Sequence, residues 1–266
     1  MRTTNGPVGN PLVAKFSQFV SLSTAEIDLL ERLCAREEQF KTGTNICDEG
    51  DPPRSIFVVT RGMACRYRLL PDGRRQILTF LIPGDLSELN EYLLKGVDHS
   101  IGAIVPTRIA AIERDVVRDI ILNHPRLAAA LWWSAMQESA MLRERIVAIG
   151  RRNARGRVAY LLCEQVWRQR AIGMAEDHSI RLPLTQIDLA DALGLTAVHV
   201  NRVLQRFREA RLINLGQRRL TLLNVAKLES IAGLKPAYLQ LNSTPPEIVR
   251  YLDELERDRD ENLDEG

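Results

Sequence analysis

The sequence of 266 residues is long enough for two domains, each with a hydrophobic core of its own. Hydrophobic residues make up 45% and charged residues 26% of the chain, as in soluble globular proteins, and no apolar run approaches the length of a membrane span. The opening residues MRTTNGPVGN lack the basic and then apolar order of a secretory signal. We therefore expect a cytoplasmic protein that does not contact a membrane.

The first half of the chain combines a short helix with many strands. The sequence Ser23-Thr-Ala-Glu26 is a capping box and predicts that a helix starts there. Over residues 40–114, short apolar runs alternate with turns that contain glycine and proline, among them Asp72-Gly73, a strong hairpin signal. Short strands separated by such turns predict a β-sandwich or barrel.

Helices dominate the next part of the chain. Residues 115–122 predict a short helix, and residues 126–150 predict one long helix with apolar residues along its length. Such a helix cannot easily bury its apolar stripe alone, so pairing with the same helix of a second copy is favoured over packing on the β-domain. A hinge at 151–156, a helix at 157–170 and a strand at 179–182 are expected to follow.

Residues 184–213 predict two helices joined by a tight turn. Thr185 and Thr196 are suited to cap the two helices, and Gly194 can adopt the left-handed conformation that ends the first. In the second helix, apolar residues recur at helical spacing and leave polar and basic residues for the other faces. An ordinary helical hairpin with a solvated face is the alternative, but a helix-turn-helix that reads the major groove is favoured.

The residues after this stretch strengthen that interpretation. Residues 211–215 and 220–223 predict a two-stranded hairpin whose turn contains Arg218 and Arg219. A hairpin directly after the second helix is typical of the wing of a winged helix, and two arginines at its tip suit contact with DNA phosphates.

The net charge of +2 hides an asymmetry along the chain. Residues 151–219 hold thirteen arginines, no lysine and six acids, a net charge of +7 that favours DNA through phosphate attraction. Residues 247–265 hold nine acids and three arginines. This acidic tail is predicted to be solvated or disordered, with a short amphipathic helix that docks on the protein as the alternative. A tail that reached the basic face would compete with DNA.

Other kinds of site find little support in the sequence. No two of the four cysteines have the close spacing of a zinc or iron–sulfur site, so buried reduced thiols are expected, and a redox role for one exposed cysteine stays open. No metal site is predicted. No nucleophile–base pair or phosphate loop of recognised spacing points to an enzyme.

The order of these elements resembles the Crp/Fnr family of bacterial transcription regulators. The resemblance covers about residues 16–234. Its most specific parts are four spaced glycines in the β-domain, the Arg-Gly-Arg-Val-Ala step at 155–159 after the long helix, and the reader sequence at 188–196; the glycines are Gly50, Gly62, Gly73 and Gly84.

The resemblance implies an α+β fold with three parts and a tail. Residues 1–124 would form a sensor domain, a double-stranded, jelly-roll-like β-roll of the cyclic-nucleotide-binding type. Residues 125–153 would form a long dimerisation helix and hinge, and residues 154–236 a winged helix-turn-helix. The acidic polar tail would be 237–266.

The implied function is a homodimer that binds a palindromic operator in double-stranded DNA, with the sensor coupled to the reader through the long helix. RNA polymerase is the expected protein partner. The alternative is a cyclic-nucleotide-responsive module that acts on a protein partner, which leaves the basic wing unexplained. The predicted DNA-binding residues are Thr185, Gln186, Thr196, His199, Asn201, Arg202, Arg206, Arg218 and Arg219.

Two parts of the predicted reader carry specificity. Arg202 matches the arginine that family members hold in the middle of the recognition helix, where it can donate two hydrogen bonds to guanine. Ala197 and Val198 stand where the cyclic-AMP receptor has an Arg-Glu pair, so a different base preference is expected.

The resemblance also implies an effector pocket, which departs further from the family; its residues are Glu88, Leu89, His99, Ser100, Leu142 and Arg143. His99 replaces the arginine that holds the cyclic phosphate, and a mostly neutral imidazole offers less charge at pH 7. Leu142 and Arg143 replace the polar pair that reads adenine. Cyclic AMP is therefore not the expected effector, and no cofactor is certain.

What the sensor detects is left open by the sequence. The cluster cysteines of the oxygen-sensing members are missing near the N-terminus, so no iron–sulfur cluster is expected. Another small ligand near His99 and Glu88, oxidation of a cysteine, and control without any ligand all remain compatible with the sequence.

Overall fold

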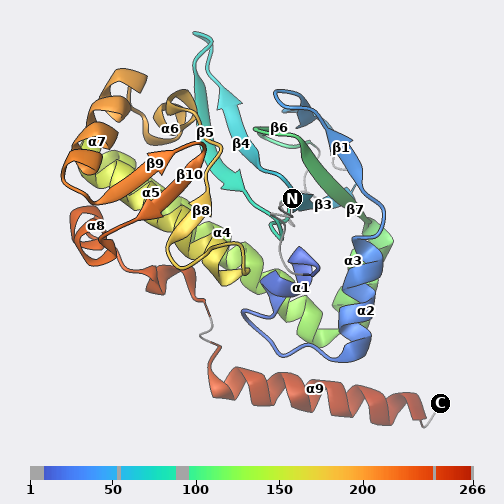
Figure 1. Cartoon of the computed structure of the whole chain (residues 1–266). Helices are drawn as coiled ribbons and strands as arrows, with labels where there is room; N and C mark the ends of the chain where they lie inside the picture. Colours follow the sequence, from blue (N-terminus) through green and yellow to red (C-terminus); the bar gives the residue numbers. More distant parts are fainter. Residues whose placement is uncertain (1–8, 53–54, 88–95, 242–243, 265–266) are drawn as a thin grey trace, which may run out of the picture.

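The computed structural model describes residues 9–52, 55–87, 96–241 and 244–264. Its central element is the 27-residue helix α4 (Pro125–Arg151), which starts and ends one residue outside the predicted 126–150. The N-terminal β-domain lies beside one part of α4, and the C-terminal helical domain lies at its other end (Figure 1). This arrangement confirms the predicted α+β fold, in which one long helix joins a β-domain to a helix-turn-helix.

Two antiparallel sheets form the β-domain. One has the strand order β1 (Glu38–Phe40), β7 (Thr107–Glu113), β3 (Ser55–Arg61), and the other has the order β2 (Asn45–Cys47), β6 (Ser100–Ala103), β4 (Ala64–Leu69), β5 (Arg75–Leu81). An apolar core with Val59, Leu81 and Ile101 joins the two sheets. Gly73 closes the β4–β5 hairpin with a φ of +80°, as the Asp72-Gly73 sequence predicted.

Three helices cover one end of the β-domain: α1 (Pro11–Phe16), α2 (Thr24–Leu33) and α3 (Arg114–Asn123). The predicted capping box is present, since the Ser23 N–H donates to the Glu26 carboxylate at 2.7 Å and the Glu26 N–H donates to Ser23 Oγ at 3.3 Å. Residues of these helices pack in one apolar cluster with Leu127 and Leu131 of α4. The cluster fixes the first half of α4 against the β-domain.

The apolar residues of α4 divide between two faces. Leu127, Leu131 and Met141 are buried inside the protomer. Trp132 and Ile146, on another face, are each 71% exposed. Packing on the β-domain therefore covers one face only, and a second apolar face is left on the surface.

The C-terminal domain has the order of a winged helix. Its helices are α5 (Ala154–Ala171), α6 (Gln186–Leu193), α7 (Ala197–Glu209) and α8 (Val225–Ala232). Its strands β8 (Ser179–Arg181), β10 (Arg219–Leu222) and β9 (Ile213–Gly216) form a small antiparallel sheet in that order. The predicted helix-turn-helix and wing are both confirmed.

Part of the acidic tail forms a helix that docks on the protein, the alternative that the sequence left open, while most of its described side chains are exposed to solvent as predicted. After a short 3-10 helix, η2 (Pro236–Leu239), the chain forms helix α9 (Pro246–Asp264). Leu252 is 5% exposed in the cluster around α1 and α4, and Asp253 pairs with Arg126 at 2.8 Å. Leu252 thus anchors the helix, whereas Ile248 and Tyr251 remain 42% and 56% exposed.

Helix α9 lies far from the DNA-reading helix of the same protomer. Helix α9 lies against the first turns of α4, at the end of the molecule remote from α7 (Figure 1). Within one protomer, the tail therefore does not cover the basic face of the reader.

Candidate DNA-reading surface and sensor site

Local hydrogen bonds define the two helices of the reader. Thr185 Oγ1 accepts from the Asp188 N–H at 3.1 Å, and the Asp188 carboxylate accepts from the Thr185 N–H at 2.9 Å. Gly194 ends α6 with a φ of +60°, a left-handed conformation that disfavours residues with a Cβ. Thr196 Oγ1 accepts from the His199 N–H at 3.2 Å and starts α7.

Helix α7 separates an apolar face from a polar one. Val200, Val203 and Phe207 are buried against the rest of the domain. The predicted DNA-binding residues of both helices and the turn are all exposed; they are Thr185, Gln186, Thr196, His199, Asn201, Arg202 and Arg206. The Gln186 side-chain amide donates to Asn201 Oδ1 at 3.3 Å, so the polar faces of α6 and α7 form one surface.

Two apolar side chains belong to the same surface, of which Ile187 was not predicted to face DNA and Val198 stands at a position where a different base preference was expected. Ile187 is 62% exposed, because α6 turns Leu189, Ala190 and Leu193 inward. Val198 is 69% exposed at the start of α7. Exposed methyl groups of this kind suit contact with thymine methyls in the major groove.

The wing separates its two arginines. Gln217 and Arg218 form the two-residue turn with φ values of +50° and +60°, which places Arg218 at the tip. Arg219 is exposed but starts β10, where its guanidinium pairs with Glu176 at 3.1 Å. The prediction of two tip arginines is therefore correct for Arg218 only.

The described residues of the predicted effector pocket lie at the start of β6, where His99 and Ser100 follow one another, and on α4, which carries Leu142 and Arg143. His99 is 1% exposed and its Nδ1 is 2.8 Å from the Asp98 carboxylate, a contact that lowers the pKa of Asp98 below its usual range. Ser100 Oγ accepts from the Glu49 N–H at 3.0 Å. Arg143 is exposed on α4 and Leu142 is half-buried, whereas Glu88 and Leu89 lie outside the described residues.

A buried ion pair in this region was missed by the sequence reasoning. Arg66 of β4 is 1% exposed and pairs with Glu138 of α4. The sequence offered one sign of this pair, the charged Arg66 within a strand whose pattern is otherwise that of a half-buried strand. Separating the two side chains would leave an uncompensated buried charge, which is costly. The Arg66–Glu138 pair therefore holds α4 against the β-domain one turn before Leu142.

Two of the four cysteines, Cys65 and Cys163, are buried as expected. All four lie in described residues and none forms a disulfide. Burial raises the pKa of the Cys65 and Cys163 thiols to about 12, so both stay protonated at neutral pH. Cys34 and Cys47 are half-buried. Among the described residues, no group of three or more histidines, cysteines and acids is arranged to hold a metal ion.

Two profiles of known domains match the chain. The cyclic nucleotide-binding domain matches residues 37–124, and the Crp-like helix-turn-helix domain matches residues 156–231. The chain is 32% identical over 214 residues to the nitrogen fixation regulation protein FixK of Bradyrhizobium diazoefficiens, which covers 80% of this chain and 88% of that protein. It is 26% identical over 216 residues to the fumarate and nitrate reduction regulatory protein of Vibrio cholerae, covering 80% and 85%.

A solved structure has the same arrangement. The structure of FixK2 from Bradyrhizobium japonicum superposes with a TM-score of 0.67 at 27% identity, covering 75% of this chain and 98% of that one. The β-domain, long helix and exposed winged helix-turn-helix define a DNA-binding transcription regulator with a sensor domain. The chain belongs to the Crp/Fnr family. In the described part of the chain, no helix is long and apolar enough to cross a membrane.

Proposed function

We propose that this protein regulates transcription by binding a palindromic operator in double-stranded DNA as a homodimer. The exposed polar face shared by α6 and α7, with Arg218 at the tip of the adjacent wing, carries the proposal. A module that acts only on a protein partner would leave Arg202 and Arg218 without a role. RNA polymerase is the expected partner of the DNA-bound protein.

The test is selection of bound sequences from a pool of random duplexes, followed by gel shift at moderate salt. We expect a palindrome whose half-site centres lie about one helical turn, roughly 34–36 Å, apart. Binding that shows no sequence preference over random duplex would contradict the proposal.

The second face of α4 supports the homodimer. Positions that are not buried recur at alternating spacings of four and three, as in the seam of a coiled coil; they are Trp132, Met136, Ser139, Arg143, Ile146 and Gly150. Three of these residues, Trp132, Met136 and Ile146, are large apolar side chains that are at least half exposed in one protomer, and an apolar patch of this kind indicates an interaction surface. Pairing of two α4 helices would bury this seam and place the two readers on either side of one axis.

Replacing Ile146 by glutamate is expected to shift the protein from dimer toward monomer, because a charge at the seam would have to be desolvated against its twin. Sedimentation at micromolar concentration measures the change, and operator affinity should fall with it. Ile121→Glu is the matched control, since Ile121 is 60% exposed on α3, away from the seam. Equal effects of the two variants would contradict pairing through α4.

Replacing Arg218 by alanine is expected to weaken binding to all duplexes alike and to lower the magnitude of the salt slope of log affinity by about one. Arg219→Ala should have the smaller effect, because Arg219 is already paired with Glu176. Titrations at several salt concentrations check both. An effect confined to one operator sequence would show that Arg218 contacts a base instead.

Cyclic AMP is expected not to stabilise the protein, and the structure gives an additional reason. Where family members place a cationic phosphate ligand, the buried imidazole of His99 contacts the Asp98 carboxylate, a negative charge that disfavours a bound phosphate. A ligand at one hundred times its Kd would add about 2.7 kcal/mol of stability. A thermal-shift titration that shows a saturable rise in Tm with cyclic AMP, and none with inorganic phosphate, would contradict this expectation.

A further inference from the structure

Strand β5 of the sensor domain contacts the reader domain of the same protomer. At its start, Arg75 Nη2 lies 2.7 Å from the Asp188 carboxylate and Arg75 Nε lies 2.9 Å from the Asp191 carboxylate. Both acids belong to α6, which lies beside the β4–β5 hairpin (Figure 1). The Arg75 guanidinium also stacks over the Tyr67 ring at 5.8 Å. One arginine thus joins the sensor hairpin to the first helix of the helix-turn-helix.

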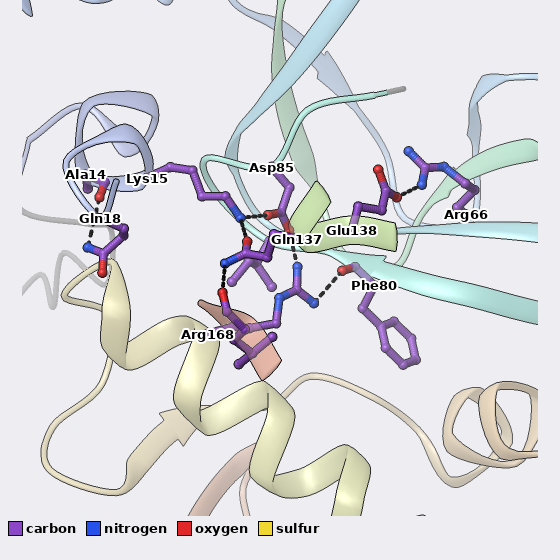
Figure 2. A network of polar contacts seen from close by, with 11 residues as sticks. Ala14, Lys15, Gln18, Arg66, Phe80, Asp85, Gln137, Glu138 and Arg168 are labelled. Atoms are coloured by element: carbon purple, nitrogen blue, oxygen red, sulfur yellow. Dashed lines mark hydrogen bonds and ion pairs between the residues drawn. The ribbon is translucent and has the colours of Figure 1, made fainter. Parts of the chain in front are cut away.

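A second polar junction follows the end of β5. Arg168 of α5 pairs with Asp85 and donates to the Phe80 carbonyl at 3.0 Å, as Figure 2 shows. Lys15 of α1 also pairs with Asp85, at 3.1 Å. The Gln137 side chain accepts from Lys15 and donates to the Leu239 carbonyl at 2.7 Å. Sensor, long helix and reader therefore meet around one buried carboxylate.

Apolar contact fills the space between the two junctions. Ile77 and Phe80 of β5 are fully buried and belong to the same apolar cluster as Leu189 and Leu193 of α6. The reader is therefore docked along β5 from one end to the other, and its orientation relative to the sensor is fixed by contacts that do not pass through the hinge at the end of α4.

The docked arrangement leaves the DNA-reading face open. Asp188 and Asp191 face the hairpin, whereas Gln186, Asn201 and Arg202 are exposed. Arg75 also neutralises two carboxylates that would otherwise repel DNA phosphates from the reader. Docking on β5 is thus compatible with DNA binding and favours it electrostatically.

We propose that Arg75 is a positioning residue for operator binding, which holds α6 on β5 so that α7 is presented to DNA in one orientation. This inference rests on the proposed function as a DNA-binding regulator. The contacts of Arg75 and Asp85 also connect sensor and reader inside one protomer without the hinge, so the long helix is one of two physical connections between the domains.

The test compares Arg75→Ala with Arg74→Ala in the full-length protein. Arg74 is the neighbouring residue with the same charge, but its side chain is 78% exposed and pairs with Asp72 of its own turn. We expect Arg75→Ala to weaken operator binding roughly five-fold or more and Arg74→Ala to leave it within about two-fold. Both variants lose one positive charge, so the difference between them reports the contact of Arg75 with Asp188 and Asp191. Arg75→Lys should restore part of the loss. Equal affinities for the two alanine variants, or tighter binding by Arg75→Ala, would overturn the proposal.

Hydrogen exchange gives a readout that does not depend on DNA. Arg75→Ala should raise exchange in the amides of β5 and α6, and Arg74→Ala should not. Weaker operator binding without this change would show that Arg75 acts through charge alone and would overturn a positioning role. If the native protein selected no operator, the proposed function would fail, and the exchange comparison would still decide whether Arg75 docks the reader.

Discussion

Replacing Arg202 by alanine is expected to weaken operator binding by about 1–3 kcal/mol and to relax selection at one base pair of each half-site. Arg202 is exposed on the polar face of α7, where a guanidinium can donate two hydrogen bonds to guanine. The buried side chains of Val203 and Phe207 hold the helix from behind, so the substitution should leave the fold intact. The loss would therefore report recognition and not stability.

The measurement is titration of the variant against the selected operator and a set of single-base-pair changes. Arg218→Ala serves as comparator, because loss of a phosphate contact should weaken all of these duplexes by the same factor. An Arg202→Ala protein that kept the native ranking of the duplexes would show that Arg202 does not read a base.

Replacing Asp85 by alanine is expected to lower the free energy of unfolding by about 3–5 kcal/mol, the usual cost of removing one partner from a buried ion pair. The substitution would leave Lys15 and Arg168, whose side chains are 9% and 3% exposed, without their shared anion. Urea unfolding of the dimer measures the change. Asp72→Ala is the control, since Asp72 lies in an exposed turn and should cause little change. Comparable losses in the two variants would contradict the role of the junction.

The same carboxylate predicts an acid-dependent loss of stability. Burial alone would raise the pKa of Asp85. The charges of Arg168 and Lys15 and the hydrogen bond from the Ile82 N–H lower this pKa by more, so that it lies below that of an ordinary aspartate. The folded form thus binds this proton less readily than the unfolded form. The stability it provides is fully present above about pH 4 and is lost as the pH falls through the folded-state pKa. Asp85→Asn should flatten this part of the stability curve.

Features that depend on neighbours in the chain were predictable from the sequence. The capping box at Ser23, the N-cap at Thr185 and the turns at Gly73 and Gly194 all formed as expected. The reason is that each depends on hydrogen bonds or φ values within a few residues. The repeated use of such signals in a distinctive order also indicated the family, which the match to residues 37–124 and 156–231 confirms.

Faces of helices were predicted less well. Periodicity identified the apolar residues of α6, but Ile187 is exposed whereas Leu189 is buried. The sequence pattern gives the spacing of apolar residues, while the position of neighbouring elements decides which of them become covered. In α9 the sequence pattern did not show which apolar residue would be covered: Leu252 is buried in the cluster around α1 and α4, whereas Ile248 and Tyr251 are exposed.

The sequence by itself determined most of the elements, their order, the exposed reader and the class of protein, because these follow from local hydrogen bonding, helical spacing and charge. Only the tertiary structure decided which charges meet. Arg75 pairs with acids 113 and 116 residues away, and Asp85 pairs with Arg168 from another domain. Such pairs form where apolar packing has already brought two surfaces together, and the free energy of that packing is a property of the whole fold.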